Sequence, residues 1–347
     1  MSQDFGVIAD LIRLHAQMRP DHQALRDSKF TLTYAELDRL MDRVAAALQR
    51  DGLGVGDAIA LCATPSARYA AMFLGALRAG VAAAPLAPGS TPASLARMIE
   101  DAGARLVFTD DFAEDASFEA WLAPAGARPA PVALSPVSPF NIIYSSGTTG
   151  EPKGIVQGHG MRWAHVKRGA NYRYGPDTVT LLSTPLYSNT TLVVFFPTIA
   201  FGGCVILMPK FDAAGYLALA QQHRVTHTML VPVQYQRLMA HPDFDRYDLS
   251  SFQMKFCTSA PFAAALKADI VKRWPGGMLE YYGMTEGGGT CILAAHEYPD
   301  KLHTVGQPAP DHDIRLIDEQ GREVGPGETG EVVGHSGAMM KGYYNQP

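Results

Sequence analysis

The chain has 347 residues, of which 47% are hydrophobic and 18% are charged, and its formal net charge is −5 at pH 7. This length allows more than one structural unit around a large core, and the hydrophobic content excludes an intrinsically disordered chain. A negative net charge without a long basic run argues against a nucleic-acid partner, although a small nucleotide needs only a local site.

Cysteine spacing and the distribution of apolar residues predict a cytoplasmic protein. The four cysteines are far apart and form no Cys-x-x-Cys pair, so we expect free thiols in a reducing compartment. The N-terminus has no basic-then-apolar signal, and no run of about 18 residues is apolar throughout. We therefore expect no membrane span.

Helices and strands alternate through the first third of the chain. Apolar residues recur at helical spacing from Phe5 to Met18, and Thr33 followed by Glu36 has the spacing of a helix-capping pair. The expected elements that follow are a helix ending near Gly52, a strand at 58–62, a helix at 66–79, a strand at 81–84, a helix at 92–102 and a strand at 106–108. This alternation predicts parallel sheet in an α/β layered fold.

The remaining elements divide the chain into three parts. A proline-rich stretch at 123–139 is typical of an extended surface connection. Strands are expected at 179–182, 205–208, 228–231 and 254–257, and short strands separated by Gly/Pro turns at 313–318 and 330–334. We predict two stacked α/β units with mostly parallel sheets, at 1–180 and 181–303, and a small antiparallel or barrel-like β unit at 304–347.

The segment 144–154 has the composition of a phosphate-binding loop. It reads Tyr-Ser-Ser-Gly-Thr-Thr-Gly-Glu-Pro-Lys-Gly and directly follows an apolar run that ends a predicted strand. Glycines let backbone N–H groups approach an anion, hydroxyls add donors, and Lys153 adds positive charge. The spacing is not that of a Walker loop. A flexible Ser/Gly linker is the alternative, but linkers seldom follow a buried strand.

A second motif, Tyr281-Tyr282-Gly283-Met284-Thr285-Glu286, combines an aromatic pair, a turn glycine, a hydroxyl and a carboxylate. An aromatic ring can stack on a purine, and a carboxylate near phosphates suits Mg²⁺, which prefers oxygen ligands. By itself the motif is equally compatible with a surface turn.

Together the two motifs resemble the signatures of the adenylate-forming enzymes, which include acyl- and aryl-CoA ligases, amino-acid-activating domains of peptide synthetases, and luciferases. Similar landmarks occur over nearly the whole chain, including 257–261, 327–331 and 341–347. The resemblance implies the large N-terminal domain of such an enzyme. Relatives continue for more than a hundred residues with a ribose-binding aspartate, a hinge and a catalytic lysine, which cannot be assigned in this chain.

The resemblance also implies roles for individual residues. Thr285, Glu286 and Lys153 would be catalytic, with Tyr282 on adenine and Glu286 on Mg²⁺. The implied ATP or AMP site consists of Ser145, Ser146, Gly147, Thr148, Thr149, Gly150, Lys153, Ser259, Ala260, Pro261, Glu280, Tyr281, Tyr282, Gly283, Met284 and Thr285. The implied acyl-substrate pocket consists of Tyr187, Ser188, Asn189, Thr190, Ser259 and Gly283.

Several positions depart from the family pattern. Ser188 replaces a gating histidine of CoA-ligase relatives, Thr258 and Ser259 stand where relatives usually have glycines, and Glu280 stands where they often have an amide. No aspartate follows Pro185 closely to pair with an amino-acid ammonium, which argues against amino-acid substrates because a buried unpaired charge is costly.

The implied activity is ATP-dependent activation of a carboxylic acid to acyl-AMP with release of pyrophosphate, followed by thioester formation with coenzyme A. The partners would be the acid, ATP and coenzyme A, and a homodimer is left open. The apolar run at 190–196, with Phe195 and Phe196, suggests an apolar acyl or aryl tail. One alternative is an adenylation domain that feeds a carrier protein, and another is a nucleotide- and acyl-binding module with little activity alone.

Overall fold

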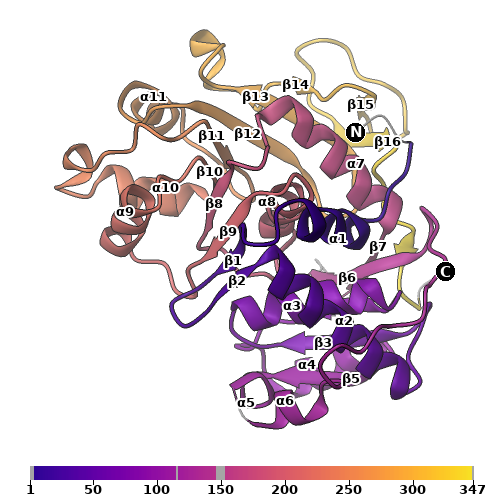
Figure 1. Cartoon of the computed structure of the whole chain (residues 1–347). Helices are drawn as coiled ribbons and strands as arrows, with labels where there is room; N and C mark the ends of the chain where they lie inside the picture. The colour runs from indigo at the N-terminus through magenta and orange to yellow at the C-terminus, as the bar shows by residue number, and fades with distance from the viewer. Residues whose placement is uncertain (1–3, 115, 146–152, 346–347) are drawn as a thin grey trace.

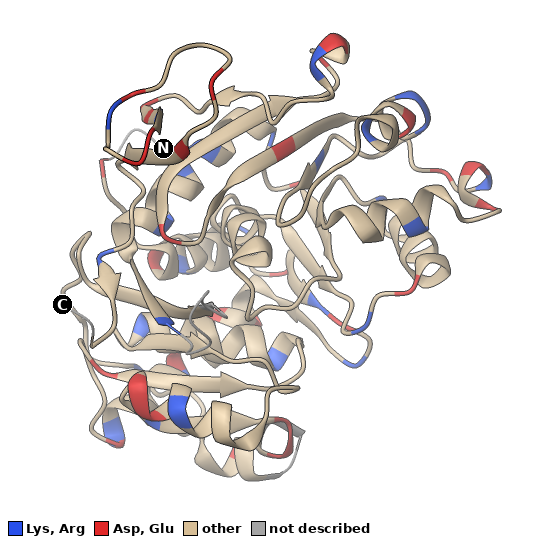
Figure 2. Cartoon of the chain, turned by 180° about the vertical axis from the view of Figure 1, so that it is seen from behind, with Lys and Arg blue, Asp and Glu red and all other residues tan. Residues whose placement is uncertain are grey.

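The computed structural model describes residues 4–114, 116–145 and 153–345. Two mixed sheets lie in separate halves of the molecule, with helices between and around them (Figure 1). Strands carry few charged residues, whereas most Lys, Arg, Asp and Glu lie on helices and loops (Figure 2). None of the helices in the described ranges is long and apolar enough to cross a membrane.

The first sheet has six strands and is built mainly from the first 158 residues. Its order is β17 (Gly342–Tyr343), β7 (Lys153–Gly158), β6 (Pro139–Ser145), β4 (Ala82–Pro85), β3 (Ala58–Cys62) and β5 (Ala104–Thr109). Pairing is parallel from β6 to β5, and antiparallel where β7 meets β6 and β17. The associated helices are α2 (Tyr34–Arg50), α3 (Ala67–Arg78), α4 (Pro92–Asp101), α5 (Asp110–Glu114) and α6 (Ala116–Trp121).

The second sheet has nine strands. Its order is β14 (Gln307–Pro308), β13 (Gly287–Ala294), β12 (Gly277–Met284), β11 (Met254–Cys257), β10 (His227–Leu230), β8 (Val179–Leu182), β9 (Cys204–Leu207), β1 (Gln23–Arg26) and β2 (Thr31–Thr33). The six strands from β12 to β1 are parallel, and the outer pairs are antiparallel. Residues 23–33 therefore belong to the sheet formed mainly by 179–308.

Helices cover both faces of the nine-stranded sheet. The helices α9 (Ala213–Gln222), α10 (Pro232–Met239) and α11 (Ala264–Arg273) lie on one side, and α8 (Asn189–Ala200), α7 (His159–Gly169) and α1 (Ile8–Met18) lie on the other (Figure 1). The described residues also form three short 3₁₀ helices: η1 (Ala170–Tyr172), η2 (Phe244–Arg246) and η3 (Pro299–Lys301).

Local sequence signals explain where many of these elements begin. Thr33 and Glu36 form a reciprocal capping box at the start of α2, as their spacing predicts, since the Thr33 hydroxyl accepts from the Glu36 N–H at 3.2 Å. The Glu36 carboxylate accepts from the Thr33 N–H at 2.8 Å. The α/β class with mostly parallel sheets is confirmed.

The C-terminal β-rich segment forms an antiparallel pair. Strands β15 (His312–Ile317) and β16 (Glu331–Ser336) pair with each other and lie against β13. The expected antiparallel arrangement is present, but within the described residues these strands do not close into a barrel, because the pair has only two strands.

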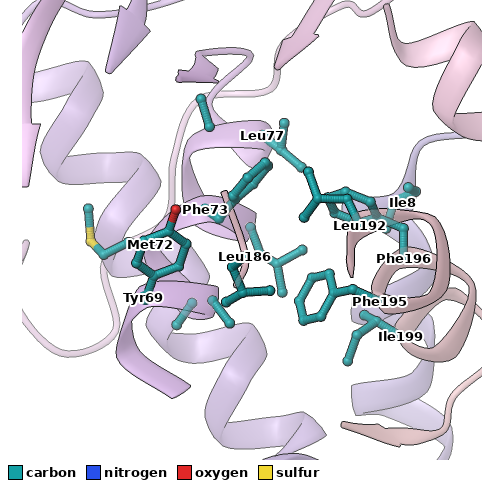
Figure 3. Packing of buried hydrophobic residues seen from close by; sticks show 14 of the residues in the cluster. Ile8, Tyr69, Met72, Phe73, Leu77, Leu186, Leu192, Phe195, Phe196 and Ile199 are labelled. Atoms are coloured by element: carbon teal, nitrogen blue, oxygen red, sulfur yellow. The ribbon is translucent and has the colours of Figure 1, made fainter. Parts of the chain in front are cut away.

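The largest core lies between the two sheets. Phe73 of α3 meets Phe196 of α8 with ring centroids 5.6 Å apart, and Figure 3 shows Phe195, Phe196 and Ile199 pointing into this cluster. Phe195 and Phe196 are almost fully buried there. These two phenylalanines, which we expected to face an acyl tail, are therefore core residues.

Candidate active site

A pocket opens between helices α7 and α8 on one side and the ends of strands β11, β12 and β13 on the other. Met161, His165 and Arg168 of α7 line it at positions i, i+4 and i+7, so they share one helix face. Helix α8 contributes Asn189, Thr190, Val193 and Pro197, which lie away from the core residues Phe195 and Ile199, and also Val194, which belongs to the core as well. The pocket thus lies along two helices that run side by side.

The opposite wall of the pocket is aromatic. Phe256 of β11 stacks on Tyr281 of β12 with centroids 5.8 Å apart and planes 10° apart. Tyr174 is parallel to Phe256 at 6.4 Å, and Tyr172 meets Tyr281 edge-on at 6.4 Å. All four rings line the pocket, so a flat apolar ligand would find stacking partners there.

A buried amide network holds one end of the pocket. Gln157 donates to the Thr285 carbonyl at 2.8 Å and lies 3.5 Å from the Asn189 side-chain oxygen. Its own carbonyl accepts from Asn141 at 3.0 Å and from Arg162. Burial lowers the pKa of Arg162 to about 9. The network ties β7 to the Thr285 backbone and the start of α8, three segments far apart in sequence.

Glu286, the predicted metal ligand, lies beside the C-terminal strand. The Tyr343 hydroxyl donates to Glu286 Oε1 at 2.9 Å, and this bond raises the pKa of Tyr343. The backbone N–H of Met340 donates to the Glu286 carbonyl at 2.7 Å. Lys153 Nζ lies 5.3 Å from the Tyr343 ring centroid. Strand β17 therefore brings the predicted catalytic carboxylate and lysine to the same aromatic residue.

The residues around Glu286 are compatible with Mg²⁺ bound together with a nucleotide. The described residues contain no cluster of three or more His, Cys, Asp or Glu that could hold a metal by itself. Mg²⁺ usually takes one or two carboxylates and completes its shell with substrate phosphates and water. Glu286 uses one carboxylate oxygen toward Tyr343, so its second oxygen fits that role.

Most of the predicted phosphate loop lies outside the described residues. This applies to Ser146, Gly147, Thr148, Thr149 and Gly150, and to the side chain of Ser145. The backbone of Ser145 ends β6 opposite Lys153, which begins β7. The loop thus connects two paired strands, in agreement with its predicted position after a strand.

Ser259 has a backbone conformation that explains the glycine of relatives. Its φ is +79°, in the left-handed region that favours glycine. Its hydroxyl lies 2.6 Å from the Thr190 hydroxyl, which links the turn after β11 to helix α8. Thr258 donates to the Tyr281 carbonyl at 2.8 Å. Both side chains line the pocket.

Some of the other predicted site residues line the pocket, and the rest lie outside its lining. Asn189, Thr190, Tyr281, Gly283, Met284 and Thr285 line the pocket. Tyr282 is 45% exposed and lies outside the lining, as do Ala260 and Pro261. Ser188 is the N-cap residue of α8 and does not line the pocket, and neither does Tyr187. The adenine-stacking role of Tyr282 stays a prediction.

Glu280 forms an ion pair within the wall. Its carboxylate is 2.6 Å from Lys267 Nζ, which also donates to the Thr304 carbonyl at 3.0 Å. Burial raises the pKa of Glu280, while Lys267 opposes that rise. Glu280 does not line the pocket, so its carboxylate serves a contact inside the protein.

Sequence reasoning missed the far end of the pocket. Met161, His165, Arg168, Tyr172, Tyr174, Phe256 and His312 line it but belong to no motif that we singled out. The helical spacing of Met161, His165 and Arg168 after the phosphate loop was the available signal. No sequence signal marked His312, because its position at the pocket depends on how strand β15 packs against the rest of the protein.

Comparisons with known proteins show to which proteins the chain is similar. The sequence pattern of a family described as AMP-binding enzyme matches residues 12–344. The feruloyl-CoA synthase of an Amycolatopsis species is 33% identical, over 96% of this chain and 70% of that protein. The indoleacetate–CoA ligase of Aromatoleum aromaticum is 29% identical, over 97% of this chain and 72% of that protein. The solved N-terminal domain of FACL13 from Mycobacterium tuberculosis is 26% identical, with a TM-score of 0.87, and the match covers 98% of this chain and 91% of that one.

Proposed function

The chain belongs to the AMP-binding enzyme family, and we propose that it activates an aromatic carboxylic acid with ATP and transfers it to coenzyme A. The reaction class, AMP-forming acid–thiol ligation, is that of its CoA-ligase relatives. The aromatic acid is inferred from the pocket wall formed by Tyr172, Tyr174, Phe256 and Tyr281, and this wall is the observation that carries the proposal. The two relatives above are also ligases named for aryl-substituted acids, ferulate and indoleacetate.

In the proposed first step, a carboxylate oxygen of the acid attacks the α-phosphorus of ATP, the bond to the β-phosphate oxygen breaks, and pyrophosphate leaves. The protein needs to align two anions and offset their charge. Lys153 would contact the outer phosphates and the Thr285 hydroxyl the α-phosphate, while Gln157 fixes the Thr285 backbone. Glu286 would hold Mg²⁺, which when bound neutralises phosphate charge. In the second step the coenzyme A sulfur attacks the acyl carbon and AMP leaves.

The pocket lining argues against an amino-acid substrate. Among the residues that the structure places around the pocket, none is an aspartate or a glutamate. A substrate ammonium there would lack a counter-ion, and an unpaired buried charge is costly. A carrier-protein acceptor in place of coenzyme A stays an alternative, as does a chain that binds but turns over slowly. Cytoplasmic location and a homodimer stay predictions.

Binding of non-hydrolysable acyl-adenylate mimics tests the proposal. The panel contains cinnamoyl, benzoyl, acetyl, long-alkyl and aminoacyl forms, with ATP and Mg²⁺ alongside, and thermal unfolding is the measurement. A mimic present at a hundred times its dissociation constant adds about 2.7 kcal/mol to stability. We expect the aromatic forms to stabilise the protein most. A preference for the aminoacyl or long-alkyl form would overturn the aromatic substrate.

Glu286→Gln tests the assigned metal site. We expect carboxylate-dependent pyrophosphate release to fall by two or more orders of magnitude, about 3 kcal/mol or more of transition-state stabilisation. The melting temperature should change little, because Glu286 is only partly buried. Glu319→Gln, in an exposed turn, is the matched control. An unchanged rate in Glu286→Gln would remove Glu286 from the mechanism.

A further inference from the structure

Arg168 occupies the part of the pocket remote from the predicted reaction centre. The start of α8, with Asn189, lies at the Gln157 network beside Thr285. The end of α7 meets the end of α8, since a Cβ on Gly169 would lie 3.2 Å from Pro197 Cβ. Eight residues separate Asn189 from Pro197, which at 1.5 Å per residue places the two ends about 12 Å apart. The backbone of Arg168, which precedes Gly169, therefore lies at this far end, and its side chain lines the pocket.

His312 presents a donor to Arg168. Its Nδ1 accepts a hydrogen bond from the Thr290 backbone N–H at 2.9 Å, so Nδ1 carries no proton. The neutral ring must then carry its proton on Nε2, which lies 3.2 Å from Arg168 Nη2. A guanidinium nitrogen is also only a donor. Two donors therefore face each other, and the contact lacks an acceptor.

No side chain of the described residues supplies that acceptor. No carboxylate in the described ranges forms an ion pair with Arg168, and none lines the pocket. His165, one helical turn before Arg168, has a buried Nδ1 without a hydrogen-bond partner. Burial, and after it the charge of nearby arginines, keeps the pKa of His165 and of His312 below the usual value, so both rings are neutral near pH 7. This part of the pocket has an excess of donors, and among the described residues Arg168 has no carboxylate within ion-pair distance.

We infer that the acid carries an oxygen substituent at the end remote from its reacting carboxylate, and that Arg168 and His312 donate to that oxygen. The inference rests on the proposed function and narrows it to acids with a distal carboxylate or hydroxyl. A single oxygen placed between Nη2 and Nε2 accepts from both groups and removes the unfavourable contact. A carboxylate also neutralises the guanidinium, so it binds more tightly than a hydroxyl. The aromatic wall holds the ring between the two ends.

The test compares para-substituted cinnamoyl-adenylate mimics that carry hydrogen, methyl, hydroxyl or carboxylate. Calorimetry on the unmodified chain should rank carboxylate above hydroxyl and both above methyl, with about ten- to hundredfold tighter binding for the oxygen-bearing forms. Arg168→Met should bring the four dissociation constants together while leaving the methyl form unchanged. Lys167→Met removes a neighbouring exposed charge and is the matched control.

The outcomes separate this inference from the proposed function. If no mimic binds, the proposed function fails. If all bind but methyl binds as tightly as hydroxyl and carboxylate, or Arg168→Met keeps the ranking, the inference is wrong while the function stands. Thermal unfolding of unliganded Arg168→Met shows whether the variant is folded, and Arg168→Lys, which keeps the charge, should retain part of the preference for carboxylate.

Discussion

Arg78 is buried and Arg168 is half-buried, and their surroundings are opposite. Arg78 is 8% exposed and bonds to carboxylate oxygens of Asp38 and Asp42 at 2.6 and 2.9 Å. It also donates to the Asp38 and Ala9 carbonyls. Arg168 has a histidine donor as its neighbour and no carboxylate partner in the described chain. The protein satisfies its interior arginine with its own groups and leaves the pocket arginine for a ligand.

His227 and His165 differ in the same way, since one has hydrogen-bond partners on both ring nitrogens and the other does not. His227 lies behind the pocket, where Nε2 donates to the Tyr172 carbonyl at 2.8 Å and Nδ1 lies 2.8 Å from the Thr226 hydroxyl. His165 lies on the pocket face and leaves Nδ1 without a partner. Unsatisfied polar groups are costly when buried, and among the described residues His165 and Tyr174 are pocket-lining residues with such a group.

Removal of the interior arginine should have the largest effect on stability. Arg78→Met removes the most deeply buried cation from Asp38 and Asp42, which keep Arg13 and, for Asp42, Arg128 as partners. We therefore expect a loss of about 3 kcal/mol in the free energy of unfolding, the lower end of the range for breaking a buried ion pair. Urea unfolding measures this loss. Arg39→Met, on the exposed face of the same α2 helix, should change stability by about 0.5 kcal/mol or less. A similar small change in Arg78→Met would mean that its ion pairs do not stabilise the fold.

Acid should destabilise the protein through its interior histidines. Burial lowers the pKa of His227 and of His159 to about 4. Between about pH 6.5 and 4 the unfolded chain binds protons that the folded chain does not, so stability falls as pH falls through this window. For His227 the loss is on the order of 3 kcal/mol. Unfolding of His227→Gln at pH 7 and at pH 4.5 should show a smaller loss than wild type, and equal losses would show that His227 titrates normally.

Backbone strain at Ser259 can be separated from its hydrogen bond. Ser259→Gly and Ser259→Ala both remove the contact with Thr190, but only glycine relieves the φ of +79°. We expect the glycine variant to be more stable than the alanine variant by about 1 kcal/mol. Thermal unfolding decides this, and an alanine variant as stable as glycine would mean that the turn holds no strain.

The pocket arginine should contribute least to folding. Arg168→Met leaves no buried carboxylate unpaired, so we expect the free energy of unfolding to change by about 0.5 kcal/mol or less. Urea unfolding beside Arg78→Met gives a direct comparison of the two arginines. A loss as large as that of Arg78→Met would show that Arg168 stabilises the fold as Arg78 does, and that the two arginines do not differ in role.

Local sequence signals were sufficient for most elements of the fold. The strands at 58–62, 179–182 and 254–257 have the predicted bounds, because short apolar runs between turn residues determine them. The capping pair at Thr33 located the start of α2. Strand partners could not be predicted in the same way, since β1 pairs with β9 and β17 with β7 through contacts between distant residues.

The candidate site was predictable where it depends on motifs. Thr285, Asn189 and Ser259 meet at one pocket, as the resemblance implied. The two faces of α8 could also be predicted, because pocket positions 189, 190, 193 and 197 alternate at helical spacing with core positions 192, 195, 196 and 199. The apolar run with Phe195 and Phe196 suggests an apolar acyl or aryl tail, but both side chains are buried in the core. The contact between Arg168 and His312 joins residues 144 positions apart, and no local pattern marks it.

The pairing of β1 with β9 also has a consequence for synthesis on the ribosome. Leu25 pairs with Val205, so about 180 further residues must be synthesised after β1 before its partner strand β9 leaves the ribosome. The six-stranded sheet gains its last strand, β17, only at Tyr343. Such non-local pairing slows folding and leaves strand edges open meanwhile. A nascent chain of this protein should therefore depend on a holding chaperone until the last residues of β9 have left the exit tunnel.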